Sequence, residues 1–506
     1  MKIKKILALF AIAISLTSCS DFLDVDPKTE IREDKMFNNE SGYKEALIGS
    51  YMLMGTPTLY GRDMTVCMLD AMAGQYEMKS TNSYINAEKH RYDLLESSFS
   101  NMWLQQYKII ANVNALLGAL EEKGKKVLHP TNYAIIKGEA LGLRAFLHFD
   151  LLRLFGWGNL KADPSGLDRL TIPYVLRYHK STTKQSTEAE VLELIHKDLK
   201  EADELLAYYD SYGPIAKRDD YELPNQDGFY SNRRNRFNYF AVRALEARVY
   251  MWEGKYQEAL DIIKPTFIDE EPIRWVSADA SINVEEKARD LSYTTEHIFN
   301  IDITSMYDAL KAYTETYDIK SGFSMSQNDQ YSYLTQANGE LLYDIADGTG
   351  LSDYRYLRGL NKTDATAWLF LKFWESPEST SPGKNKMPLI RKPEMYYYAA
   401  ECYNELGHTK KAIELINTVR MARGILYEKN LPETLSKEEI DAAIEKEWRK
   451  EYIGEGQMFF YYKRLGKPVP NATVSGDDLF VIPLPEKEVE IGGREDYGKT
   501  DIDKNN

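Results

Sequence analysis

The chain has 506 residues, of which 43% are hydrophobic and 28% are charged, proportions typical of a globular protein. Its 78 acidic and 63 basic side chains give a net charge of −15. No basic stretch offsets that charge, so the composition argues against a nucleic-acid-binding protein. Tyrosine is abundant, with 36 residues against 18 Phe and 7 Trp. Its flat apolar face and hydroxyl group suit polar ligands, although most of these rings are expected between helices.

Residues 1–18 are predicted to be a signal peptide. Three lysines among the first five residues precede an apolar run, Ile6–Leu16, that is too short to cross a bilayer as a helix. The run ends in Leu-Thr-Ser-Cys, which resembles the bacterial lipoprotein signal, in which the cysteine (here Cys19) carries the lipid. The alternative is an uncleaved anchor helix with an incidental cysteine. We expect the mature chain to begin at Cys19 and to be tethered to a membrane rather than to span it.

Hydrophobic periodicity predicts four helices before residue 210. They lie at residues 38–54, 100–123, 132–155 and 187–208. The last of them begins at a capping box, Ser186-Thr187-Glu188-Ala189-Glu190. Residues 55–100 are rich in Gly, Ser, Asn, Thr and Met and show weak periodicity. We call this stretch the first excursion and expect it to be irregular; long loops on a rigid helical frame often carry function.

One pattern occurs twice, at residues 240–263 and 395–418. When Ala247 is aligned on Ala400, other positions fall in register. They are Tyr250 with Tyr403, Gly254 with Gly407, Ala259 with Ala412 and Ile263 with Ile416. This is the spacing of a tetratricopeptide-type helix pair, in which small residues let two antiparallel helices approach closely. Each glycine is expected to end its first helix, because that position needs a positive φ at little steric cost.

Residues 265–381 form a second excursion, where helical periodicity breaks into short runs and we expect mixed short helices and strands. Residues 436–464 are predicted to be one long helix, and residues 479–490 to contain a short apolar strand or extended piece closed by Pro483 and Pro485. Cys67 and Cys402 are expected to be buried and unpaired, although a disulfide between them remains open.

After the signal peptide we expect one domain, residues 19–506. It has an N-terminal helical part (19–235) and a second part that holds the helix pairs, the second excursion and the C-terminus (236–506).

Several motifs together resemble the SusD/RagB family of bacterial surface lipoproteins. The opening CSDFLDVDPKTEI has the family's style of lipid cysteine, acids and a proline. The others are WLQQYKIIANVNALL with IKGEALGLRAFLHFDLLRLFG, then KMPLIRKPEMYYYAAECYNELG, IEKEWRKEYIGEGQMFFYYKRLG and FVIPLPEKEV. Together they span residues 19 to about 490. The corner FGWGNL lacks the common acid and proline, and MFFYYKRLG lacks the usual Trp-Asp, which indicates a divergent branch.

The resemblance implies a mainly α fold, with tetratricopeptide-like helix pairs in an α–α superhelical scaffold, long irregular excursions and a few short strands. It also implies a lipid-anchored, cell-surface protein that captures oligosaccharide and delivers it to a SusC-like TonB-dependent transporter of the outer membrane. Asp21, Asp24 and Asp26, behind Cys19, resemble the surface-export tag of Bacteroidetes-type lipoproteins. A peptide ligand, an assembly scaffold without a ligand and a surface glycoside hydrolase are the alternatives.

No catalytic motif is evident in the sequence. HExxH, GxSxG, P-loop and GxGxxG patterns are absent, and the seven histidines lack metal-ligand spacing. Acidic residues are numerous enough that counting leaves a glycosidase carboxylate pair open. We expect a binding protein that is not an enzyme and that has no cofactor, no catalytic metal and no nucleic-acid partner.

Sugar binding needs a flat aromatic face flanked by amide and carboxylate groups. Members of the SusD/RagB family tend to build their site from the two excursions, so the resemblance places the candidate ligand residues there. In the first excursion they are Asp70, Gln75, Tyr76, Asn82 and Tyr84; in the second they are Trp275, Tyr293, Tyr307 and Tyr313, with Asp302 and Asp308 nearby. The remaining prominent aromatic residues are expected to be structural, because they lie in helical stripes or near the LKFWE motif (residues 371–375) that leads to the second helix pair. They are Trp103, Trp252, Trp448, Trp368, Phe373 and Trp374.

Overall fold

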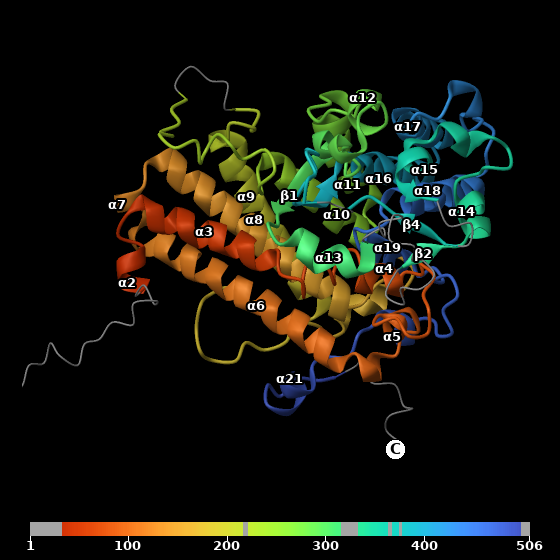
Figure 1. Ribbon diagram of the computed structural model, residues 1–506. Helices are drawn as coiled ribbons and strands as arrows, with labels where there is room; N and C mark the ends of the chain where they lie inside the picture. Colours follow the sequence, from red (N-terminus) through yellow and green to blue (C-terminus); the bar gives the residue numbers. More distant parts are fainter. Residues whose placement is uncertain (1–32, 216–220, 315–331, 363–366, 374–376, 497–506) are drawn as a thin grey trace, which may run out of the picture.

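Helices build most of the protein in the computed structural model (Figure 1). The structure describes residues 33–215, 221–314, 332–362, 367–373 and 377–496. Within these ranges the strands are short, and the longest of them have 6 residues. The fold is therefore mainly α, which confirms the expectation from the sequence.

The N-terminal helices begin where the sequence provides capping side chains. α3 (Glu40–Met54) starts after Asn39, whose side chain accepts a hydrogen bond from the Gly42 N–H at 3.2 Å. α9 (Glu188–Tyr209) starts at the predicted capping box, in which Thr187 and Glu190 each accept the other's backbone N–H. The other elements of this part are α2 Glu33–Met36, α4 Met68–Met72, α5 Ile85–Glu88, η2 Tyr92–Leu94, α6 Glu96–Ala119, the π-helical turn η3 Leu120–Gly124, α7 Lys125–Val127, α8 Pro130–Phe155 and η4 Pro164–Asp168.

The duplicated pattern forms two helix pairs. The first is α10 (Tyr239–Glu253) with α11 (Tyr256–Ile263), and the second is α16 (Lys392–Glu405) with α17 (Thr409–Ala422). Gly254 and Gly407 have φ values of +72° and +81°, as the alignment predicts. In both copies the N–H after the glycine donates to the carbonyl of the aligned tyrosine, Tyr250 or Tyr403, at 2.9 and 2.7 Å.

The long helices pack in succession, so that each contacts the next along the molecule. The order is α3, α6, α8, α9, α10, α11, α16, with α17 and α18 (Lys437–Glu451) packing on α16 and on each other. This succession produces the superhelical frame seen in Figure 1. The two excursions leave the frame between α3 and α6 and between α11 and α16.

The second excursion contains short helices and strands, as predicted. After the π-helical turn η5 (Lys264–Asp269) its elements are α12 Ala278–Ser281, η6 Glu286–Ala288, η7 Thr294–Glu296, β1 His297–Asp302, α13 Met306–Thr314, β2 Tyr333–Leu334, α14 Gln336–Leu342, η10 Thr349–Ser352, α15 Tyr354–Arg358, β3 Leu360–Asn361 and β4 Trp368–Phe370, and the strand β5 Lys386–Arg391 follows it. β1 pairs with β5 in an antiparallel ribbon, and β4 lies between β2 and β3 in a second antiparallel sheet. The β1–β5 pairing therefore connects the excursion to the strand that leads into α16.

The prediction of one long helix over residues 436–464 is wrong. The structure has two helices, α18 and α19 (Gln457–Leu465), because the chain turns sharply between them. Gly454 and Gly456 have φ values of +83° and +67° there, conformations that a side chain would strain. Their N–H groups both donate to the buried carboxylate of Asp70, from the first excursion. The contact that fixes the break comes from a residue far away in the sequence.

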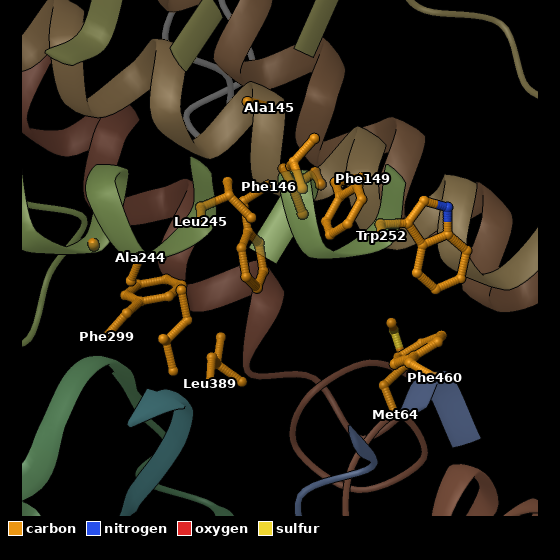
Figure 2. Close-up of a cluster of buried hydrophobic side chains, with 14 of the residues drawn as sticks. Met64, Ala145, Phe146, Phe149, Ala244, Leu245, Trp252, Phe299, Leu389 and Phe460 are labelled. Carbon is orange, nitrogen blue, oxygen red and sulfur yellow. The ribbon is translucent and has the colours of Figure 1, made fainter. Parts of the chain in front are cut away.

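A continuous apolar core connects the frame to both excursions (Figure 2). Phe146 of α8 packs edge-on against Phe299 of β1, with ring centroids 5.3 Å apart. Met64 of the first excursion and Phe460 of α19 belong to the same cluster. Trp103, Trp252 and Trp448 are each no more than 2% exposed, which confirms their structural role.

The chain after α19 is mostly extended, with two short helices, α20 (Asp477–Phe480) and α21 (Glu486–Glu490). Residues 481–485 are extended and form no described strand, which matches one of the two predicted alternatives. Cys67 and Cys402 are buried and unpaired, as expected. Among the helices in the described ranges, none is both long and apolar enough to cross a membrane.

Candidate functional site

The two excursions meet at one edge of the helical frame. Glu77 and Tyr333 form an isolated antiparallel bridge, with backbone N–H to carbonyl distances of 2.7 and 3.2 Å. The carboxylate of Glu77 also accepts hydrogen bonds from the backbone and the side chain of Thr335, the N-cap of α14. Figure 1 shows α4, α13, β2 and β4 gathered in this region. We call it the excursion junction.

Aromatic side chains from both excursions line a small cavity at the junction, which we call the aromatic cavity. Its lining includes Tyr76 from the first excursion and Tyr313, Phe370 and Phe373 from the second. The rings of Tyr76 and Phe370 lie 5.4 Å apart, centroid to centroid. The enclosed volume is about 20 Å³, room for a water molecule, so a larger ligand would lie across its aromatic rim rather than inside it.

Tyr313, at the end of α13, is half-buried at this rim. Its ring meets the edge of the Tyr84 ring at 5.4 Å, and the Arg62 guanidinium lies 5.9 Å from its centroid. Tyr84 is itself buried and donates a hydrogen bond to Asp63 at 2.7 Å. The first excursion therefore supports the Tyr313 ring from behind, which limits its motion.

A second, larger cavity lies on the other side of Lys372, and we call it the polar cavity. Its volume is about 220 Å³, and it is lined mainly by charged and hydroxyl side chains of the second excursion. These include Lys287, Arg289, Ser292, Lys372, Ser379 and Ser381. Lys372 lines both cavities, so the aromatic and the polar surfaces adjoin.

Lys372 is held by α18 and by the turn that follows it. Its ammonium group donates to the Glu451 carbonyl at 2.7 Å and pairs with the Glu455 carboxylate. Burial, reinforced by the Arg391 guanidinium, lowers the pKa of Lys372 to about 8, while Glu455 and Glu451 oppose that shift. The amine is therefore predominantly protonated at neutral pH.

Buried ion pairs fasten the second excursion to the helices behind it. The Glu451 carboxylate accepts hydrogen bonds from Arg391 at 2.7 Å, Arg423 at 2.8 Å and Arg355 at 3.1 Å. Burial opposes ionisation of Glu451 most strongly, yet the guanidiniums of Arg423 and Arg391 hold its pKa well below the usual range. Arg355 comes from the excursion, Arg391 ends β5, the strand that follows it, and Arg423 follows α17, so one carboxylate joins three segments.

The five residues predicted from the first excursion serve mostly as supporting groups at the junction. Asp70 is fully buried and accepts hydrogen bonds from Gly454, Gly456 and, at 3.0 Å, from the Tyr76 hydroxyl. Burial raises the pKa of Asp70 to about 7 against the effect of these hydrogen bonds. Tyr76, 5% exposed, reaches the aromatic cavity, and Tyr84 supports Tyr313.

The two amides predicted from the first excursion are also buried. Gln75 donates to the Arg449 carbonyl at 3.2 Å, on α18. Asn82 accepts the Tyr84 backbone N–H at 2.8 Å and so fixes the turn before α5. Both amides hold the first excursion in place beside the aromatic cavity.

The predicted residues of the second excursion fall into two groups. Tyr313 belongs to the junction, and Tyr307 lies half-buried on the same helix, with the Lys311 ammonium 5.4 Å from its ring centroid. Trp275 and Tyr293 lie instead beside the second helix pair, where the Arg423 guanidinium sits between them, 5.7 and 4.4 Å from the two centroids. Asp302 and Asp308 are exposed and pair with Lys386 and Lys311.

Sequence reasoning did not select several residues that line the two cavities. Phe370 and Arg289 carry no periodic or motif signal, and Lys372 and Phe373 both belong to LKFWE (residues 371–375), which indicates a structural role. Phe373 is 5% exposed and Trp368 is 4% exposed, and both are packed in the core, although Phe373 also lines the aromatic cavity. Trp374 and Cys19 lie outside the described residues.

Two carboxyl groups have strongly raised pKa values, which elsewhere can mark acid–base catalysts. Besides Asp70, burial raises the pKa of Glu188 to about 8, although that carboxylate accepts hydrogen bonds from the Trp157 backbone and the Trp252 indole. Both groups are fully buried, and burial is the largest cause of both shifts, although the buried Lys463 ammonium opposes the shift of Glu188. In the described part of the chain no group of three or more His, Cys, Asp or Glu side chains is arranged to hold a metal ion.

A rigid stack of helices that presents an aromatic surface on long excursions defines a helical-repeat binding protein. Comparison with known families gives a more specific assignment. Residues 21–217 match a family described as "Starch-binding associating with outer membrane", and residues 295–505 match the SusD family. The chain belongs to the SusD family. One of the two matching family models is described by starch binding and by association with the outer membrane.

Similar proteins span nearly the whole chain. SusD-like protein P25 of Formosa agariphila is 23% identical, over 83% of this chain and 82% of its own length. SusD-like protein P38 of the same organism is also 23% identical, over 92% of this chain and 93% of its own length.

Solved structures of the superfamily have the same fold. A SusD superfamily protein from Bacteroides thetaiotaomicron has a TM-score of 0.68 at 20% identity, covering 91% of this chain and 100% of its own. A SusD-like carbohydrate binding protein from Bacteroides vulgatus has a TM-score of 0.64 at 19% identity, covering 85% and 84%. At these identities the likeness establishes the fold alone.

Proposed function

We propose that this protein captures oligosaccharide at the excursion junction and delivers it to a SusC-like TonB-dependent transporter of the outer membrane. One observation carries the proposal: aromatic residues from two distant excursions converge on one surface beside a polar cavity. In a carbohydrate-binding family, such a surface offers what a sugar chain requires, namely flat rings for the apolar faces and polar groups for the hydroxyls.

Tyr313 is the central ligand-contacting residue in this proposal. Its ring is partly exposed and supported by Tyr84, so little conformational entropy is lost when a pyranose packs on it. Tyr76 and Tyr307 are the next contacts. Asp70, Gln75, Asn82 and Tyr84 act from behind by fixing the surface. Trp275 and Tyr293 form a second candidate surface beside the helix pair.

The same proposal places the protein at the cell surface. Cys19 carries the lipid that anchors the chain in the outer membrane, and the acidic residues behind it direct export. The mature chain functions as one domain, residues 19–506, because its helices pack in a single succession. The helix pairs form the rigid back of the molecule and face the transporter.

A ligand screen with matched variants tests the binding proposal. Purified protein is screened against an array of oligosaccharides and a peptide library, and affinities are measured by calorimetry. Tyr313→Ala should weaken glycan binding roughly tenfold or more, since the stacking surface is lost, without lowering the unfolding midpoint appreciably. Tyr427→Ala is the control, because this tyrosine is 79% exposed on the distant turn η11 (Tyr427–Lys429).

The outcomes separate the alternatives. Loss of binding in Trp275→Ala, with Tyr313→Ala unchanged, would move the site to the surface beside the helix pair. Binding of peptides alone would replace the glycan by a peptide as cargo. Turnover of a polysaccharide by the purified protein would contradict a pure binding role.

A further inference from the structure

The polar cavity contains a cation that no described acid neutralises. Of the basic residues that line it, Lys372 pairs with Glu455, and Lys287 lies 3.8 Å from Glu285. Arg289 forms neither an ion pair nor a side-chain hydrogen bond with any described residue. The acid on the cavity wall, Glu286, is exposed to solvent. The cavity therefore has a positive charge available on one wall.

Arg289 is also incompletely satisfied as a hydrogen-bond donor. Its Nε is shielded from solvent, yet it donates to no atom of the described residues. Buried donors nearly always have a partner, because an unmet donor has lost its water without replacement. A guanidinium is matched best by a planar or tetrahedral oxyanion, which accepts two of its N–H groups at once. The two Nη groups are not shielded in this way, and they are the donors that an anionic ligand group in the cavity can reach.

The opposite wall of the cavity is built and closed by its own hydrogen bonds. The Thr380 N–H donates to the Lys287 carbonyl at 2.8 Å, and the Lys384 ammonium donates to the Pro377 carbonyl at 2.9 Å. Gly383 donates its N–H to the Ser381 hydroxyl at 3.0 Å. These bonds hold the serine hydroxyls at fixed positions around the cavity, so the site is preorganised rather than formed by the ligand.

Gly383 provides the space between these hydroxyls. A Cβ atom at this position would lie 2.7 Å from the Ser292 Oγ, closer than a side chain normally permits, and 3.4 Å from both the Ser381 Oγ and the Asp290 Oδ1. The Ser292 hydroxyl donates to Asp290 at 3.4 Å. The Ser381 hydroxyl accepts the Gly383 N–H, so its own proton can be donated to an oxyanion or to a sugar hydroxyl.

We propose that the polar cavity recognises an anionic substituent of the glycan, a uronate carboxylate or a sulfate ester, with Arg289 as the specificity-determining residue. The sugar ring next to it packs on the aromatic rim across Lys372. The cavity, at about 220 Å³, is smaller than the site of a whole drug-sized ligand and suits one substituted sugar unit. This inference rests on the proposed function, and it narrows the cargo to acidic glycans.

Pairs of probes that differ only in charge test this inference. Calorimetry compares tetragalacturonide with its methyl ester, and a sulfated galactan oligomer with its desulfated form, alongside an array of other acidic and neutral oligosaccharides. At least one charged probe should bind about ten- to a hundredfold more tightly than its neutral partner. The pair that shows the preference distinguishes carboxylate from sulfate recognition.

Two variants of equal charge change locate the effect. Arg289→Gln should abolish the preference for the charged probe and leave the unfolding midpoint unchanged, since Arg289 bonds to nothing described. Arg274→Gln is the matched control: Arg274 is exposed in the same excursion and lines neither cavity. It should keep the full preference.

Three results would overturn the inference. The first is equal affinity of the protein for the charged and the neutral probe of every pair. The second is a preference for the charged probe that survives in Arg289→Gln. The third is a preference that Arg274→Gln reduces as much as Arg289→Gln does, which would indicate general electrostatic attraction. If neutral glycans bind and lose affinity in Tyr313→Ala, the proposed function stands while this inference fails. If no glycan on the array binds, both fail.

Discussion

Glu451 shows how much of the second excursion depends on a single side chain. Its carboxylate, fully buried, accepts hydrogen bonds from three guanidiniums, those of Arg355, Arg391 and Arg423. A buried ion pair adds little net stability compared with an apolar contact, because both charges have lost their water. Removing Glu451 is different, since the three buried guanidiniums would keep only their other carboxylate partners, which are Asp353, Glu447, Glu296 and Glu455. The cluster therefore fixes which way the excursion packs.

Glu451→Gln should lower the free energy of unfolding by about 3 kcal/mol, because the uncharged amide removes one shared counter-charge from three buried guanidiniums that each keep another carboxylate partner. Equilibrium denaturation in urea measures the change. The matched control is Glu433→Gln, which removes the partner of Lys410 in a pair whose side chains are 77% and 69% exposed. That variant should be close to the wild type, since exposed pairs contribute little. Equal losses in the two variants would refute the role given to Glu451.

His148 is a second residue whose charge state matters for the fold. Its Nδ1 donates to the Arg144 carbonyl at 2.9 Å, and its Nε2 accepts the Val175 N–H at 3.0 Å. An imidazole that accepts a backbone N–H is neutral, and burial lowers the pKa of His148 to about 3 from its ordinary 6.5. The ring also stacks on Tyr174, with centroids 3.8 Å apart.

This histidine should make the protein less stable in acid. Between pH 6.5 and 3 the unfolded chain binds a proton at this position that the folded chain does not, so stability falls as the pH falls through that window. From pH 7 to pH 5 the loss from His148 is about 2 kcal/mol. In His148→Gln the decline of unfolding free energy over this range should be shallower by that amount, whereas in His179→Gln, an exposed position, it should match the wild type. Parallel curves for the wild type and His148→Gln would contradict the assignment.

The two helix pairs depend on small residues where their helices touch. Ala247 and Ala400 are both fully buried, at equivalent positions of the two copies. A side chain larger than alanine would separate helices that touch there. The α10–α11 pair and the α16–α17 pair also contact each other through α11 and α16, so a disturbance at one site reaches its neighbour.

Ala247→Trp and Ala400→Trp should each cost about 3 kcal/mol or more, and the double variant should not fold. Circular dichroism and thermal unfolding measure the effect. Ala442→Trp is the control, because Ala442 is exposed on α18 and an indole can point into water there. A folded, glycan-binding double variant would show that the pairs do not form the structural core.

Local signals in the sequence were sufficient for most helices but not for the break between α18 and α19. The capping box of α9 and the glycines at 254 and 407 act within a few residues, so a single sequence reveals them. The turn at Gly454 and Gly456 depends on Asp70, which the fold brings there from more than 380 residues away. Apolar residues continue in helical register across that turn, so periodicity alone favours one helix, although Gly454 and Gly456 are a local signal of a break.

At the scale of the whole molecule, the sequence predicted the frame and the two excursions but not the surface between them. The bridge from Glu77 to Tyr333 and the cavities beside Lys372 depend on tertiary contacts across long loops. The aromatic residues predicted from the second excursion lie in two separate places. Tyr313 is at the excursion junction, and Trp275 packs beside α16. Composition can propose candidates in an excursion, but it cannot say which of them meet.

The position of the three cysteines makes lipid attachment testable on the whole molecule. Cys67 and Cys402 are buried at 1% and 0% exposure, and burial raises the pKa of both thiols well above the ordinary value, so neither is accessible for acylation in the folded protein. Only Cys19 remains as an attachment point.

In cells fed labelled palmitate, Cys19→Ala should therefore lose all label, leave the outer-membrane fraction and no longer co-purify with the transporter. Cys67→Ala should keep both label and location, with at most a modest loss of stability from the cavity it creates. Persistent label in Cys19→Ala would refute the predicted anchor, and label lost in Cys67→Ala alone would mean that the buried thiol is reached before the chain folds.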